Sequence, residues 1–123
     1  MKYRIEHWAP INNPLLGDKA EMHIISSDSV TVGKAVFKEP MALMEHSHLN
    51  EQVTIVLNGE MEIILRGEKK LVKKGQACII PSNEQHTVTI TKTPFESFDV
   101  FTPIREDYVK DALTQPKKNH HSI

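Results

Sequence analysis

The sequence predicts an all-β fold, a barrel or a sandwich, from two observations. Short runs rich in Val, Ile, Thr and Phe recur along the 123 residues at fairly even spacing, with turn residues between them. No helical pattern interrupts this series, which ends near residue 101. The expected strands cover residues 22–26, 30–37, 53–57, 61–66, 69–72, 77–80, 87–91 and 97–101.

The connections between these runs carry turn residues of known types. Asn58-Gly59 lies between the runs 53–57 and 61–65 and predicts a tight hairpin, because a type I′ turn needs positive φ at both central positions. A Pro-Ser-Asn segment that starts at Pro81 predicts a further turn just before His86.

Both ends of the chain are less regular than its centre. Residues 8–18 are expected to form a loop, residues 106–113 a short helix, and the polar segment 115–123 a flexible tail. The length suits one domain, expected over residues 1–114 with its barrel core at about 29–102.

Composition and charge exclude several classes of partner. The 15 Lys and Arg nearly balance the 16 Asp and Glu, so no basic field favours nucleic acid or anionic lipid. No stretch is apolar for the length of a membrane span, and the N-terminus lacks an apolar signal region, so a cytoplasmic protein is expected. Cys78 has no cysteine to pair with and lies in an apolar run, which predicts a buried, unreactive thiol.

The predicted strand 53–57 is apolar on both faces, because Val53, Ile55 and Leu57 alternate with Thr54 and Val56. One face of an antiparallel sheet normally meets water. The outer face is therefore expected to be covered, either by the N-terminal segment or by a second subunit, and we expect a homodimer.

His46 and His48 are spaced H-x-H, the most informative local pattern in the chain. On a strand, side chains one residue apart project from the same face, so both imidazoles can reach one metal ion. Gln52 shares their parity, and His86 opens another strand-like run, so both are candidate partners. Taken singly, His46 and His48 would be interpreted as exposed loop residues and His86 as a hydrogen-bonded core residue.

Two motifs frame these residues. The segment 45–60 resembles the first motif of the cupin family, and Gly75-(x5)-Pro81-(x4)-His86 resembles the second. The resemblance implies a jelly-roll barrel, a cupin double-stranded β-helix, with one divalent metal ion inside. It implies the ligand set His46, His48, Gln52 and His86. Asn83 stands where the second motif often has Gly, and because Asn also tolerates positive φ the turn is expected to survive.

The fourth ligand and the identity of the metal follow from ligand chemistry. Glu51 is the rival of Gln52, but strand parity directs it away from the histidines unless Leu49-Asn50 forms a bulge. Three imidazoles and an amide oxygen suit Zn, Ni, Fe, Mn, Co or Cu, and the choice among them stays open. A neutral Gln leaves the double charge of the ion uncompensated, which favours an anionic or oxygen-rich guest.

A second group of residues lies near the end of the predicted barrel. Asp99 and Phe101 share one strand face, and Arg105 follows a turn that contains Pro103. Arg can bind a carboxylate bidentately, Asp can move a proton, and Phe can pack against a sugar ring. The spacing alone is equally consistent with a structural Asp-Arg ion pair over a core Phe.

These residues together resemble the small cupins of pectin and alginate breakdown, which linearise the unsaturated uronates that polysaccharide lyases release. The resemblance implies metal-assisted conversion of a 4,5-unsaturated uronate to a linear keto sugar, with Asp99, Phe101 and Arg105 acting on a small anionic substrate. Two alternatives remain: an oxygenase that uses Fe, Ni or Cu, and a cupin that binds a small molecule or sugar without converting it.

Overall fold

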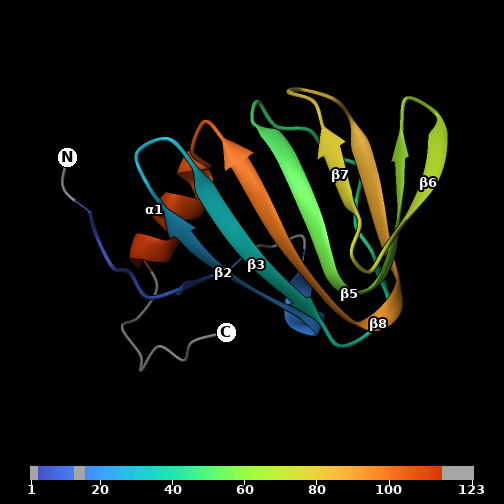
Figure 1. The fold of residues 1–123 in the computed structure, drawn as a ribbon, viewed down its shortest axis with the longest axis horizontal. Helices are drawn as coiled ribbons and strands as arrows, with labels where there is room; N and C mark the ends of the chain where they lie inside the picture. The colour runs from blue at the N-terminus through green and yellow to red at the C-terminus, as the bar shows by residue number, and fades with distance from the viewer. Residues whose placement is uncertain (1–2, 13–15, 115–123) are drawn as a thin grey trace.

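The computed structural model describes residues 3–12 and 16–114, which form a β-barrel with one α-helix near its C-terminal end (Figure 1). The all-β class with a short terminal helix is therefore confirmed. The strands are β1 Ala9–Ile11, β2 Ala20–Ser26, β3 Thr31–Phe37, β4 Met41–Ala42, β5 Glu51–Leu65, β6 Glu68–Lys73, β7 Ala77–Ile80 and β8 His86–Thr102. A 3-10 turn, η1, covers Gly17–Lys19, and helix α1 covers Glu106–Thr114.

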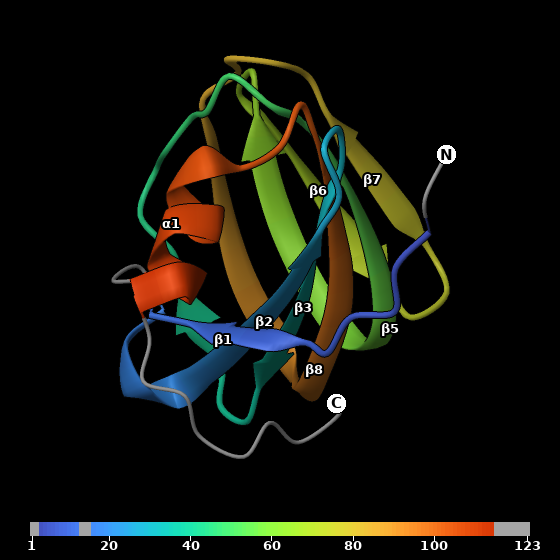
Figure 2. The ribbon, with the colours of Figure 1, turned by 90° about the vertical axis from the view of Figure 1, so that its left-hand side faces the viewer.

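Two long strands, β5 and β8, are shared by two walls of the barrel (Figures 1 and 2). The first half of β5 pairs with the second half of β8 and with β7, and β3, β2 and β1 extend this wall in that order beyond β8. The second half of β5 pairs with the first half of β8 and with β6, while β4 pairs with β8. Each strand therefore bends from one wall into the other.

The predicted hairpin at Asn58-Gly59 is wrong, because the chain continues through it as a single bent strand. The runs on either side do not pair with each other but follow β8, with register shifts between Val56 and Met61. Gly59 has φ of 79°, and a Cβ on it would lie 2.4 Å from the carbonyl oxygen of Lys92. Positive φ and close backbone approach require glycine at a bend as much as in a hairpin turn.

The two predicted strands 87–91 and 97–101 are likewise parts of one strand, β8. Buried and partly exposed residues alternate along β8, and this alternation shifts by one residue at the bend. Even-numbered residues such as His86 and Ile90 are buried before the bend, and odd-numbered residues such as Phe95 and Asp99 are buried after it. Strand β5 changes phase in the same way. The bends therefore keep core residues and site residues facing one interior.

The remaining strands and α1 close the barrel at its edges. Strands β6 and β7 agree with the predicted runs, whereas β1 and the two-residue β4 were not predicted. Strand β1 lies within residues 8–18, where only a loop was expected; residues 13–15 lie outside the described part of the chain. Helix α1 packs Tyr108, Val109 and Ala112 against the core.

The outer face of the first wall is partly covered by the N-terminal segment. The indole of Trp8 stacks on the ring of Phe98, with ring centroids 6.1 Å apart and planes 7° from parallel. Ile79, at the β7 edge beside Val53, is 68% exposed.

Among the described residues, no helix has the length and apolarity that crossing a membrane requires. The domain limits of 1–114 and the flexible tail stay predictions, since residues 115–123 lie outside the described structure.

Candidate metal centre

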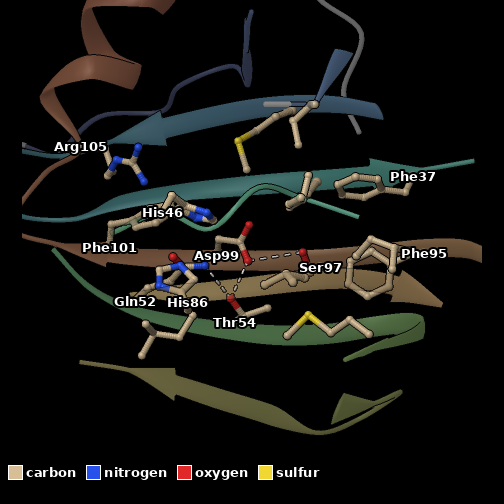
Figure 3. Close-up of a pocket in the computed structure, with 18 of the residues that line it drawn as sticks. Phe37, His46, Gln52, Thr54, His86, Phe95, Ser97, Asp99, Phe101 and Arg105 are labelled. Carbon is tan, nitrogen blue, oxygen red and sulfur yellow. Dashed lines mark hydrogen bonds between the residues drawn. The ribbon is translucent and has the colours of Figure 1, made fainter. Parts of the chain in front are cut away.

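Three histidines from two distant segments, His46, His48 and His86, meet at one end of the barrel. Figure 3 shows two of them, His46 and His86. His46 and His86 face each other across an isolated antiparallel bridge, and their backbones exchange two hydrogen bonds of 3.0 and 2.9 Å. His48 joins them from the loop before β5, so that one ring nitrogen of each histidine lies within 4.8 Å of the others. The expected H-x-H strand is thus a bridge followed by a loop, yet both imidazoles reach the same point.

The outer nitrogen of each imidazole is held by a backbone carbonyl. Nδ1 lies 2.8 Å from the Met44 oxygen in His46, 2.9 Å from the Asn50 oxygen in His48, and 2.8 Å from the Glu84 oxygen in His86. A carbonyl only accepts, so each Nδ1 donates a hydrogen bond, and in the neutral ring Nε2 carries the lone pair. Backbone carbonyls commonly fix metal-binding histidines in this tautomer.

Burial favours the neutral form of two of these rings. It lowers the pKa of His86 to about 4, and it lowers the pKa of His48, with a further contribution from the charge of Arg105. A neutral imidazole is the form that binds a metal ion.

Gln52, the second residue of β5, brings an amide oxygen to the cluster. Its Oε1 lies 2.9 Å from Nε2 of His48, and its Nε2 donates a hydrogen bond of 2.8 Å to the hydroxyl of Thr54. Glu51, the rival ligand, is exposed, and Leu49-Asn50 lie in the loop before β5 and not in a strand bulge. The residues brought together are therefore those that the resemblance implies: His46, His48, Gln52 and His86.

The contact between His48 and Gln52 is a direct test of whether the site suits a metal ion. With Nδ1 of His48 donating to a carbonyl, its Nε2 and the amide oxygen are two acceptors 2.9 Å apart. Two lone pairs at this distance repel each other unless a cation lies beside both. Two ligand atoms about 2.1 Å from one ion and at right angles to each other lie about 3.0 Å apart. The donor set therefore fits a divalent transition metal ion.

A buried carboxylate lies next to this cluster. Asp99 of β8 is opposite Thr54 of β5 in the strand pairing, and its Oδ1 accepts a hydrogen bond of 2.8 Å from the Thr54 hydroxyl. Ser97 approaches the same oxygen at 3.4 Å. In Figure 3 the other carboxylate oxygen points away from Thr54 and Ser97. Burial raises the pKa of Asp99 to about 6, although these hydrogen bonds oppose the shift.

Arg105 reaches the cavity from the segment between β8 and α1. Its guanidinium carbon lies 4.8 Å from the ring centre of Phe101 and 3.8 Å from that of Tyr108. Nε and Nη2 donate to the carboxylate of Asp107 at 3.0 and 2.7 Å, so the described ion pair of Arg105 is with Asp107 and not with Asp99. The structural Asp99-Arg105 pair considered from sequence is absent from the described residues.

Phe101 lies between the histidine cluster on one side and Arg105 with Tyr108 on the other. It is 1% exposed, and its ring lies edge-on to both His48 and Tyr108, with centroids 5.7 and 5.6 Å away. The three residues expected to act on substrate, Asp99, Phe101 and Arg105, therefore line the same cavity as His46, Gln52 and His86.

Sequence reasoning missed residues that hold this arrangement. Thr54 and Ser97 have the same inward parity as Gln52 and Asp99, a signal that could have found them. The buried Asn50 donates hydrogen bonds to the carbonyls of Pro103 and Ile104, which ties the His48 loop to the segment that carries Arg105. Only the fold brings these two segments together, so no local pattern predicts that link.

The cavity itself is small. Its volume of about 70 Å³ is enough for a few water molecules or part of a small molecule and not for a polysaccharide chain. Away from the histidines it is lined by apolar side chains, including Phe37, Met61 and Phe95. A ligand that reaches the histidines must therefore be small.

Comparison with known proteins identifies the class. The model of the cupin domain family matches residues 35–101, more than half of the chain, and the protein belongs to this family. No curated protein sequence matches the chain.

Solved structures share the fold at low sequence identity. KdgF from Halomonas sp. superposes with a TM-score of 0.70 at 21% identity, over 83% of this chain and 92% of that one. An RmlC-like cupin from Shewanella frigidimarina gives 0.70 at 22% identity, over 81% and 88%. A predicted oxalate decarboxylase from Thermotoga maritima gives 0.66 at 19% identity, over 85% and 100%. At these identities the similarity shows the jelly-roll fold of the cupins.

Proposed function

We propose that this cupin is a metal-dependent enzyme that converts a 4,5-unsaturated uronate to its linear keto form. One observation carries the proposal: a single small cavity brings together candidate metal ligands, a buried carboxylate and a guanidinium stacked on aromatic rings. The sequence resemblance to the cupins of pectin and alginate breakdown supports it, as does the similarity in fold to KdgF.

The ligands of the metal ion would be His46, His48, Gln52 and His86. When bound, the ion supplies a Lewis acid that polarises a substrate oxygen. Four protein ligands leave one or two positions free in a five- or six-coordinate shell, which is what substrate binding requires.

Arg105 would bind the substrate carboxylate. Its pair with Asp107 uses Nε and one hydrogen of Nη2, so the donors on Nη1 are left over from that pair. Stacking on Tyr108 and Phe101 fixes the plane of the guanidinium. The side chain of Arg105 is 12% exposed, whereas that of Asp107 is 64% exposed, so the charge directed at the cavity is the one shielded from water.

Asp99 would move the proton. In the reaction the C1 hydroxyl loses its proton, the bond from C1 to the ring oxygen breaks, and the ring oxygen gains a proton to give an enol. Transfer of the enol proton to C4 then gives the ketone, so the net change is an isomerisation without electron transfer. A carboxylate with a pKa of about 6 can both accept and return a proton near neutral pH.

The reaction assay is direct. Purified protein is mixed with the unsaturated monomer made by a polysaccharide lyase, and loss of the conjugated-alkene absorbance is followed. The protein is expected to speed this loss, and Arg105→Ala is expected to slow it by at least a hundredfold with metal content unchanged. Arg4→Ala removes an exposed arginine that pairs with Glu6 and serves as the control.

Decay at the spontaneous rate with metal-loaded protein would rule the proposal out. The rate should also be the same with and without oxygen, because no electrons are transferred. A rate that requires oxygen would support the oxygenase alternative instead.

The protein is also proposed to be a homodimer through the outer face of the first wall. Trp8 covers Phe98, but Ile79 and its neighbour Val53 extend an apolar surface beyond that cover. Light scattering at micromolar concentration should give twice the chain mass of 14.0 kDa, and a monomer mass would contradict the proposal.

A further inference from the structure

A chain of buried hydrogen bonds runs from Asp99 to the candidate metal ligands. Thr54 lies in its middle, 3% exposed, on the strand position two residues after Gln52 and directly opposite Asp99. The Thr54 hydroxyl donates to Oδ1 of Asp99 at 2.8 Å and accepts from Nε2 of Gln52 at 2.8 Å (Figure 3).

The number of available hydrogen atoms fixes the direction of each hydrogen bond in this series. A threonine hydroxyl has one hydrogen, and an ionised carboxylate can only accept, so that hydrogen is directed to Asp99. The hydroxyl oxygen can then only accept from the amide of Gln52, which directs the NH2 group to Thr54. The amide oxygen is therefore directed to the opposite side, 2.9 Å from Nε2 of His48.

The orientation of this amide decides whether Gln52 can be a ligand at all. Its oxygen offers lone pairs to a metal ion, whereas its NH2 group offers only hydrogens. With the amide reversed, the NH2 group would donate to the free Nε2 of His48 and occupy the lone pair of a second ligand. One rotation of about 180° would therefore remove two ligands from the site.

We propose that Thr54, held by Asp99, is a positioning residue that keeps the amide oxygen of Gln52 turned toward the metal ion. This role rests on the proposed metal centre and adds to it the reason that a neutral glutamine can replace a carboxylate as ligand. A carboxylate has two equivalent oxygens and needs no such orientation, whereas an amide does.

The test measures Zn²⁺ affinity by competition with a chromophoric chelator. Thr54→Val keeps the shape of the side chain and removes both hydrogen bonds. It should weaken Zn²⁺ binding by about 10–100-fold, as does the loss of other residues that hydrogen-bond a metal ligand. Thr54→Ser keeps the hydroxyl and should bind as wild type. Thr89→Val makes the same substitution on β8 outside the cavity, and it should change affinity by less than about threefold.

The same Thr54 substitution in a Gln52→Glu variant distinguishes loss of amide orientation from loss of side-chain packing. In Gln52→Glu, both terminal atoms of residue 52 are oxygens, so adding Thr54→Val should weaken Zn²⁺ binding by less than about threefold. Equal losses in the Gln and Glu backgrounds would overturn the inference, because packing alone would then explain them. No loss in the Gln background would overturn it as well.

Folding and the metal centre itself are checked in the same series. Urea denaturation establishes that each variant is folded, and Thr54→Ala replaces Thr54→Val if the valine variant does not fold. Wild-type protein that binds none of Zn²⁺, Ni²⁺ and Mn²⁺ would contradict the proposed centre and the inference together. Wild-type binding with an unaffected Thr54→Val variant would contradict the inference alone.

Discussion

The two ends of the cavity differ in chemistry although the same two strands build both. At one end Gln52 of β5 and Asp99 of β8 lie beside the histidines, and at the other Phe95 packs edge-on against Phe37 with ring centroids 5.7 Å apart (Figure 3). The polar groups lie near the ends of the strands, where loops add His48 and further groups. The apolar residues lie next to the bends, where the two walls meet.

This difference indicates a division of roles. Side chains near the bends are surrounded by the barrel on all sides and supply apolar burial, which stabilises the fold. Side chains near the strand ends adjoin loops and supply ligands. Substitutions at the apolar end should therefore change the free energy of unfolding and leave metal affinity unchanged, and substitutions at the polar end should do the reverse.

The largest effect is expected at the apolar end. Phe95→Ala deletes a ring that is 1% exposed and should lower the free energy of unfolding by about 3–5 kcal/mol. Urea denaturation measures this loss. Phe98→Ala, on the outer face under Trp8, should cost clearly less. If the folded Phe95→Ala protein also loses its metal affinity, the two ends are not separable.

At the polar end, His86→Ala should weaken metal binding by at least a hundredfold. It removes a ligand, which should lower metal affinity by more than the 10–100-fold typical of losing a residue that only hydrogen-bonds a ligand. Metal affinity by competition and metal content by elemental analysis measure the effect. His7→Ala removes an exposed histidine outside the cluster and should leave both unchanged. Normal metal content in His86→Ala would place the metal elsewhere.

The bend in β5 lies beside the apolar end and can be tested by a matched pair of glycines. Gly59→Ala should lower the free energy of unfolding by about 1–3 kcal/mol more than Gly67→Ala does. Both glycines have positive φ, 79° and 75°, but only at Gly59 does an added Cβ meet backbone atoms within 4 Å. Equal losses in urea denaturation would show that close approach to β8 does not matter.

The smallest effect is a change in reactivity at Cys78. Burial, and to a lesser extent the charge of Asp99, raise the pKa of this thiol to about 11. Iodoacetamide alkylation, followed by mass spectrometry, should therefore be slow at pH 8 and rise about tenfold per pH unit toward pH 11. Asp99→Asn should speed alkylation at a given pH, because it removes a negative charge that disfavours the thiolate. Alkylation of wild-type Cys78 at pH 8 as fast as that of an exposed cysteine would contradict this prediction.

Local sequence patterns predicted the fold class and the residues of the polar end. Runs rich in Val, Ile, Thr and Phe located most of the strands, and the resemblance to the two cupin motifs implied that His46, Gln52 and His86 lie together. The hairpin at Asn58-Gly59 was wrong for a physical reason: a glycine at positive φ fits a turn and a bend equally well. Pairing with β8, more than thirty residues away, decides between them.

Other parts of the site depend on contacts that no local pattern contains. Strand β1 exists because Ala9 and Ile11 pair with β2, despite a segment rich in turn residues. Asp107 was not among the expected site residues, and its ion pair with Arg105 follows from the turn that begins α1. The role of Thr54 required its distance to Asp99, a residue 45 positions away.

The central claim is that the polar end is a metal centre that performs the conversion of the uronate. The most direct test returns metal ions to chelator-treated protein and follows loss of the alkene absorbance as each portion is added. The rate should be close to the spontaneous rate without metal and should rise to a plateau at one ion per chain. Full activity in the metal-free protein, or a rate that does not respond to added metal, would contradict the claim.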